Sequence, residues 1–149
     1  MIVDNAARTV PAPVQAAFLA WLGAIAAGVV ETAVWVAQEP WSLSDVGPGI
    51  AVRAAIYCAA VCVFVLMRAG RNWARLVLTV VLGVIGTLSL VIEPVGWLLD
   101  GNSLGDAIAG AGAADWLIAI SRAAHLAAVA AGVVLMYRPA ANRYFRAAS

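Results

Sequence analysis

The run from Leu76 to Ile92 contains no charged residue, and it is one of four long apolar runs in the chain. A helix needs about 20 apolar residues to cross the hydrocarbon core of a bilayer. Only 11% of the residues are charged, whereas soluble globular domains usually contain about 25%. This shortage of polar surface predicts that lipid, rather than water, surrounds most of the protein.

Four membrane spans account for most of the 149 residues, with approximate boundaries at 14–37, 50–67, 73–99 and 115–137. The runs are longer than strands, and apolar residues fill all their faces, which indicates helices. We therefore predict an all-α membrane protein with four transmembrane helices in two antiparallel hairpins, forming a single domain over residues 1–149. Little of the chain remains for a soluble catalytic domain.

The segments between these spans contain residues that favour loops. Residues 38–49 include Pro40 and Pro48, and residues 100–114 are rich in glycine, with room for one short interfacial helix. Near the end of the third span, Pro94 removes a backbone donor and should kink or end the helix. After the fourth span, Pro139 is expected to stop the helix and leave a basic, aromatic tail.

A turn rich in arginine, residues 67–75, lies between the second and third predicted spans, and we call it the arginine turn. Positive charge near the ends of spans marks the cytoplasmic side, and interfacial tryptophans anchor helices there. The turn contains no acid, and its anchoring residues are Arg68, Arg71, Trp73 and Arg75. The C-terminal segment is also basic, through Arg138, Arg143 and Arg146. The other two loops carry only acids, namely Glu39, Asp45, Asp100 and Asp106. Both termini are therefore predicted to be cytoplasmic, in a multi-pass protein of the inner membrane.

Five ionisable residues fall inside the predicted spans, and we call them the polar cluster: Glu31, Arg53, Glu93, Arg122 and His125. A charge at the centre of a membrane helix costs about 2.5–3.5 kcal/mol on insertion scales, so such residues need partners. The predicted orientation places all five in the outer half of the bilayer. Arg122 is expected to pair with Glu31 or Glu93, which would lower the cost of both members. His125 follows Arg122 by three residues and is the best candidate for proton transfer.

Three interpretations of the polar cluster stay open. It could hold the bundle together, form a polar pocket that binds a ligand or relays protons, or face a partner subunit. A metal or cofactor is not expected, because the chain has one histidine and no compact set of ligands. The thiols of Cys58 and Cys62 are predicted to be free and buried. A net charge of +1 gives no reason to expect nucleic acid as a partner.

Two motifs resemble those of small actinobacterial, mycobacterial-type integral membrane proteins with four spans. One is Arg71-Asn-Trp-Ala-Arg-Leu-Val-Leu-Thr-Val80, which is similar to a GRNWAR-type cytoplasmic turn that opens the third helix of those proteins. The other is the ending Pro139-Ala-Ala-Asn-Arg-Tyr-Phe-Arg146. The resemblance implies the source and the four-span architecture. It supplies no reaction and no catalytic residue.

A comparison with small multidrug transporters is less favourable. Those proteins also have four spans and a membrane carboxylate in the first. Here Glu31 lies near the outer end of its span, and Arg53 and Arg122 fit poorly with a cavity for cations.

The leading hypothesis is a non-enzymatic accessory or scaffolding subunit of an inner-membrane envelope or transport assembly. Its partners would be the lipid bilayer and other membrane subunits, or copies of itself. The alternative is a protein that binds or transports a lipid or small molecule through the outer polar cluster. A third hypothesis, an intramembrane enzyme, has only Glu31, Glu93 and His125 to offer.

Overall fold

The computed structural model describes residues 9–38 and 42–148, and within these ranges it contains helices and no strand. Four helical segments are long and apolar enough to cross a membrane, which confirms the prediction of an all-α chain with four such segments. Three of them are α1 (Ala12–Gln38), α2 (Leu43–Arg68) and α6 (Ala113–Met136). The remaining one, which we call the third span, runs through α3 (Asn72–Val77), the π-helical stretch η1 (Leu78–Gly86) and α4 (Thr87–Leu99). Two short helices, α5 (Leu104–Gly110) and α7 (Pro139–Ala148), lie outside the spans.

The predicted start of the second span is wrong, and the error involves a proline. The second span begins at Leu43, so residues 43–49 are helical and Pro48 lies inside α2. The backbone N–H of Ser42 donates a hydrogen bond to the Asp45 carboxylate at 3.2 Å, which helps to start the helix before the proline. The third span continues past Pro94 to Leu99, which is the end predicted for it. Each proline removes one backbone hydrogen bond, a loss that long membrane helices tolerate. Of the residues predicted to form the first loop, 39–41 lie outside the described ranges.

The arginine turn is short because Gly70 adopts a left-handed backbone conformation, with φ of +87°. The N–H of Gly70 donates to the carbonyl of Met67 at 2.9 Å, and the N–H of Arg71 donates to the carbonyl of Leu66 at 3.0 Å. This pair of hydrogen bonds is the Schellman ending of a helix, which favours glycine at the position with positive φ. The chain therefore reverses direction within a few residues and enters α3.

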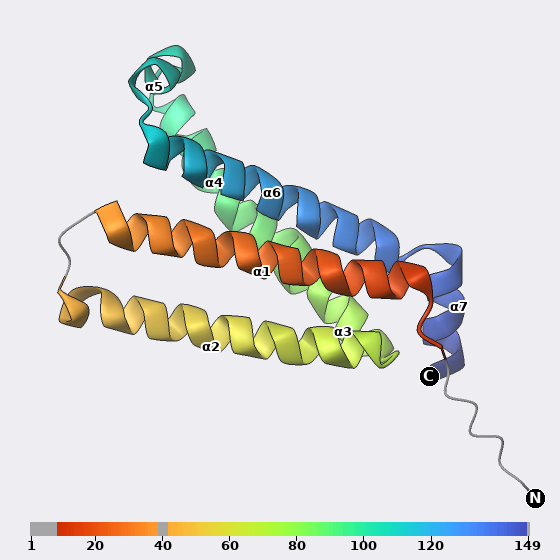
Figure 1. Cartoon of the computed structure of the whole chain (residues 1–149). Helices are drawn as coiled ribbons and strands as arrows, with labels where there is room; N and C mark the ends of the chain where they lie inside the picture. The colour runs from red at the N-terminus through yellow and green to blue at the C-terminus, as the bar shows by residue number, and fades with distance from the viewer. Residues whose placement is uncertain (1–8, 39–41, 149) are drawn as a thin grey trace, which may run out of the picture.

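The helices pack around Trp21, which is fully buried on α1. Its ring stacks on Phe64 of α2 with the ring centroids 5.8 Å apart. On the other side it lies against Gly132 of α6, where an added Cβ would be 2.9 Å from Cε2 of the indole. Glycine at 132 therefore allows α6 to approach α1 closely, and the two helices run alongside each other (Figure 1).

At the end that carries the arginine turn, which we call the basic end, α7 packs against the bundle. The fourth span ends before Pro139, as predicted, but the helix that Pro139 then opens, α7, was not predicted. Proline suits the first position of a helix, where its missing N–H has no partner to lose. The side chains of Ala141 and Phe145 are buried, so α7 closes this end of the bundle.

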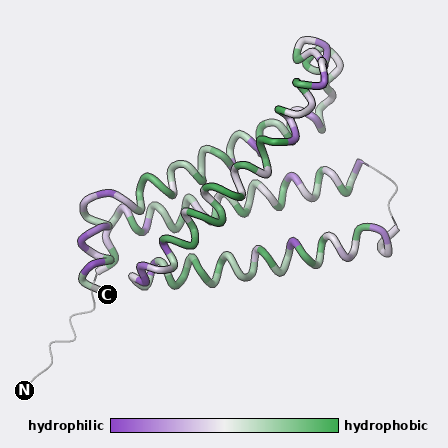
Figure 2. The backbone as a smooth tube through the Cα atoms, turned by 180° about the vertical axis from the view of Figure 1, so that it is seen from behind, coloured by the Kyte–Doolittle hydropathy of each residue, from purple (hydrophilic) through white to green (hydrophobic). Residues whose placement is uncertain are grey.

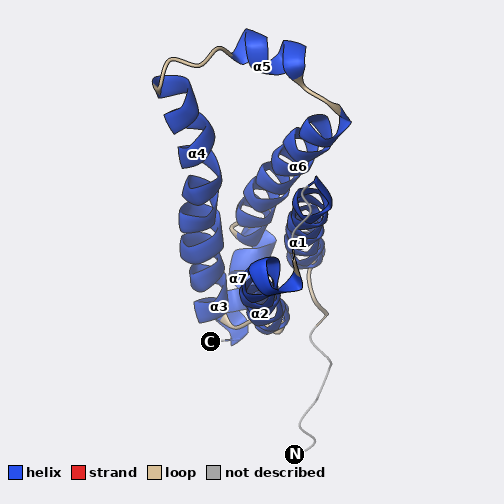
Figure 3. Cartoon of the chain, turned by 90° about the vertical axis from the view of Figure 1, so that its left-hand side faces the viewer, coloured by secondary structure: helices blue, strands red, loops and turns tan. Residues whose placement is uncertain are grey.

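The opposite end, which we call the acidic end, is more open. Figure 3 shows α4 and α6 diverging towards α5, and Figure 2 shows that hydrophobic residues dominate the long helices between their more polar ends. Exposed tryptophans lie near both ends: Trp73 at the basic end, and Trp35, Trp97 and Trp116 at the acidic end. Such rings are typical of membrane–water interfaces.

Candidate functional site

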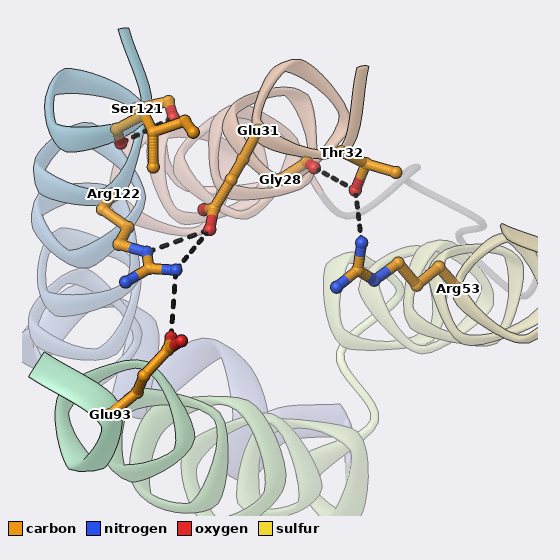
Figure 4. A network of polar contacts seen from close by, with 8 residues as sticks. Gly28, Glu31, Thr32, Arg53, Glu93, Ser121 and Arg122 are labelled. Atoms are coloured by element: carbon orange, nitrogen blue, oxygen red, sulfur yellow. Dashed lines mark hydrogen bonds and ion pairs between the residues drawn. The ribbon is translucent and has the colours of Figure 1, made fainter. Parts of the chain in front are cut away.

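Three members of the polar cluster meet in an ion triad that joins α1, α4 and α6 (Figure 4). Nε of Arg122 donates to Oε1 of Glu31 at 2.9 Å, and Nη2 of Arg122 lies 2.9 Å from the same oxygen. Nη2 also donates to Oε2 of Glu93 at 3.3 Å. The side chains of Glu31 and Arg122 are 22% and 31% exposed, whereas that of Glu93 is 77% exposed. Glu31 is therefore the principal partner of Arg122, and Glu93 is a peripheral one.

Arg53 lies apart from this triad and bonds to a neutral group. Its Nη1 donates to the hydroxyl of Thr32 at 3.3 Å, and that hydroxyl donates to the carbonyl of Gly28 at 2.8 Å. Figure 4 shows Glu31 pointing from α1 towards Arg122, while Thr32 points towards Arg53 on α2. Among the residues that the structure describes, Arg53 forms no ion pair with an acid.

A cavity of about 280 Å³, which we call the central cavity, lies among α1, α2, the third span and α6. Apolar side chains line most of it, including those of Trp21 and Phe64. Polar lining groups include Glu31 and Arg53. Along α1, Glu31 lies ten residues after Trp21, or about 15 Å at the rise of a helix. The central cavity is therefore apolar towards the basic end and polar towards the acidic end.

His125 lines the central cavity from α6 and is half-buried. No hydrogen bond to its ring is found within the described part of the chain. Arg122, one turn earlier, instead lines a second, shallower hollow between α4 and α6. The structure therefore divides the polar cluster into two groups. Glu31, Arg53 and His125 border the central cavity, whereas Arg122 and Glu93 do not border it. Arg122 contacts Glu31, and Glu93 contacts Arg122.

Three polar residues of the cavity were not anticipated as site residues from the sequence: Thr32 of α1, Tyr57 of α2 and Ser89 of α4. Tyr57 follows Arg53 by four residues, which places both on one face of α2, so this spacing could have revealed it. Its hydroxyl lies over Gly28, where an added Cβ would be 2.7 Å from the oxygen. Glycine at 28 therefore makes room for the tyrosine hydroxyl.

The two cysteines of α2 differ from the prediction in one respect. Cys58 and Cys62 are free thiols, but both are exposed on the surface of the helix rather than buried within the bundle. In a membrane that surface is covered by lipid, which suits an apolar thiol as well as a protein core does. Neither residue borders the central cavity.

The side chains that usually bind metal ions are dispersed in the part of the chain that the structure describes. There, no three side chains of histidine, cysteine, aspartate or glutamate gather into a set that could hold a metal ion. Comparison with protein-family models, with curated proteins and with solved structures finds no match to the chain. The resemblance to actinobacterial four-span proteins stays a prediction.

Proposed function

We propose that this protein is a non-enzymatic, multi-pass inner-membrane protein that binds a lipid or another amphipathic small molecule in the central cavity. The cavity itself carries the proposal, because it is apolar over most of its surface and polar near the acidic end. At about 280 Å³ it lies just below the usual range of small-molecule pockets, roughly 300–1,000 Å³. One flexible alkyl chain with a polar head suits such a space better than a bulky ring system.

The proposed topology has the spans in two antiparallel hairpins, with both termini and the basic end in the cytoplasm. Exposed arginines at that end, including Arg71, Arg143 and Arg146, support this orientation through the positive-inside rule. The central cavity would then open in the outer half of the bilayer. Reporter fusions after Ser149 and within residues 100–106 test the assignment, and an external C-terminal reporter would overturn it.

Binding can be measured through Trp21, which is fully buried and borders the central cavity. A variant that keeps Trp21 as its only tryptophan should lose fluorescence when an uncharged amphiphile with a brominated chain enters the cavity. The quenching should be saturable and reversed by the same amphiphile without bromine. Quenching that rises linearly and is not reversed would mean that the chain merely dissolves in the detergent around the protein.

A pair of matched variants separates cavity binding from general contact with the helices. Gly86 borders the central cavity on the third span, and an added Cβ there meets only the carbonyl of Val81, at an ordinary 3.5 Å. Gly86→Leu should fill part of the cavity and weaken saturable quenching several-fold. Gly96→Leu, on the same span where an added Cβ meets nothing within 4 Å, is the control and should bind normally.

An accessory or scaffolding subunit of a membrane assembly is the second candidate function. One face of α6 favours it, because Ala123, Ala127 and Ala131 are exposed at four-residue intervals. Small residues at this spacing let helices approach closely in membranes. Ala127→Leu should then dissociate a complex that survives mild detergent, while Ala54→Leu on the exposed surface of α2 should not. A wild-type chain that sedimented as a monomer, with no other protein bound, would exclude this candidate.

A further inference from the structure

The two charged groups at the polar end of the central cavity are paired unequally. Glu31 borders the cavity, and its Oε1 accepts both short contacts from Arg122, so it already has an ion-pair partner on α6. His125 is half-buried and also lines the cavity. Arg53, by contrast, bonds only to the hydroxyl of Thr32. The cavity therefore ends beside a positive charge that forms no ion pair with an acid in the described structure.

The guanidinium of Arg53 also has unused donors. Arginine carries five N–H groups in a planar fork, and a single hydrogen bond of 3.3 Å to Thr32 occupies one of them. Figure 4 shows the side chain of Arg53 reaching from α2 towards α1, so its charged end lies between these two helices. Guanidinium groups bind carboxylates and phosphates through pairs of parallel hydrogen bonds. An anion that replaced the hydrogen bond to Thr32, or bound beside it, would therefore gain both the attraction of the positive charge and a pair of parallel hydrogen bonds.

We propose that the amphiphile bound in the central cavity is anionic, with its carboxylate or phosphate on Arg53 and its chain extending towards Trp21 and Phe64. This inference rests on the proposed binding function and names the chemical class of its ligand. A charge within a membrane span is costly without a partner, and the head group supplies that partner. The apolar walls of the cavity accept the chain.

A cationic ligand on Glu31 is the competing assignment. It is disfavoured because such a ligand would have to compete with Arg122, which approaches Glu31 at 2.9 Å and also bonds to Glu93. It would also bring a second positive charge towards Arg53. The two assignments predict opposite orders of affinity for ligands with the same chain and different heads.

The test uses the Trp21-only protein in neutral detergent and brominated probes of equal chain length. The heads are a carboxylate and a phosphate, compared with an alcohol and a primary ammonium. Both anionic probes should bind about tenfold more tightly than the alcohol, because hydrogen bonds between charged groups are stronger than those to a neutral hydroxyl. The ammonium should bind most weakly. The relative affinities of the carboxylate and phosphate probes show which anion the guanidinium of Arg53 binds better.

Variants of Arg53 then test the residue itself. Arg53→Gln should lower the affinity for the anionic probes about tenfold, towards that of the alcohol. Arg53→Lys should keep part of the preference, because the charge remains but the fork is lost. Arg143→Gln removes the same charge from an exposed position on α7 and should change nothing. Circular dichroism of each variant confirms that the helices are intact.

The outcomes separate the two proposals. Equal binding of all four probes, or tightest binding of the ammonium, would overturn the anionic assignment and leave the proposed binding function standing. If no probe quenches Trp21 in a saturable manner, the binding function itself is wrong.

Discussion

The two ends of the bundle use arginine in opposite ways. At the basic end, the guanidinium of Arg75 lies 4.6 Å from the ring centroid of Tyr137 and 4.8 Å from that of Phe145. It also donates a hydrogen bond of 2.6 Å to Asn142, so one side chain joins the third span to α7. At the acidic end, Arg53 makes one hydrogen bond of 3.3 Å and borders a cavity.

The packing of the helices also differs between the basic end and the acidic end. Tyr144 of α7 donates to the carbonyl of Arg68 at 2.9 Å, so the arginine turn and α7 are tied together where the helices converge. The ion triad on Arg122 ties α1, α4 and α6 at the other end, but α4 and α6 still diverge beyond it (Figure 3). A closed end holds the helices in register, and a divergent end leaves room for a ligand. The predictions below test this division, beginning with the largest effect.

Removing the packed centre should have the largest effect on stability. Trp21→Ala leaves a large void between α1, α2 and α6, and truncation of a buried aromatic residue typically costs about 3–5 kcal/mol. Thermal unfolding in detergent, followed by circular dichroism, should show a large drop in the midpoint. Trp73→Ala, at an exposed interfacial position, is the control and should change the midpoint far less. Similar losses for both variants would contradict the assignment of Trp21 to the core.

Weakening the contacts of α7 at the basic end should have the second-largest effect on stability. Arg75→Gln removes two cation–π contacts and the hydrogen bond to Asn142, with an expected cost on the order of 2 kcal/mol. Hydrogen exchange of the α7 amides should accelerate, while the amides of α1 remain protected. Arg71→Gln is the matched control, because Arg71 is exposed and lies in the same turn. Unchanged exchange in α7 after Arg75→Gln would show that this arginine does not hold the end closed.

The ion triad should respond unequally to loss of its two acids. Glu31→Gln removes the closest and least exposed partner of Arg122 and should destabilise the protein by about 1–3 kcal/mol. Glu93→Gln removes a largely exposed partner and should cost less than about 1 kcal/mol. Unfolding of the two variants under identical conditions measures the difference. A larger effect at Glu93 would reverse the assignment of principal and peripheral partners.

Loss of Arg53 should have the smallest effect on stability. Arg53→Gln removes one long hydrogen bond from an exposed residue, and such changes usually alter stability by less than about 0.5 kcal/mol. Its consequence should appear in ligand affinity instead. A loss of stability as large as that of Arg75→Gln would mean that Arg53 is a structural clamp, and the contrast between the two ends would disappear.

The apolar runs were sufficient to predict the helices but not all their ends. Leu76–Ile92 lies within the third span as expected, because length and uniform hydrophobicity leave helix as the only suitable structure in lipid. The prediction starts the second span too late, after Pro48, since composition shows where a hydrogen bond is lost but not whether the remaining helix tolerates the loss. In α7, Pro139 both ended one helix and began another.

The site could be predicted only in outline. Helical spacing and charge balance were enough to anticipate a pair between Arg122 and Glu31 or Glu93. They could not show that Arg122 would contact both acids, nor that Arg53 would turn away from them to Thr32. Those details depend on how far α1, α2 and α6 stand apart, which Gly28, Trp21 and Gly132 determine through contacts between distant parts of the chain.

The most direct measurement is to locate the bound chain by photocrosslinking. An anionic amphiphile with a diazirine at the end of its chain is irradiated with the wild-type protein, and the modified residues are identified by mass spectrometry. We predict modification of Trp21, Phe64 or Leu82, which border the central cavity, and its loss when the unmodified amphiphile competes. Modification confined to outward-facing residues such as Val80 and Ile85, which are exposed on the third span, would contradict the proposed cavity site.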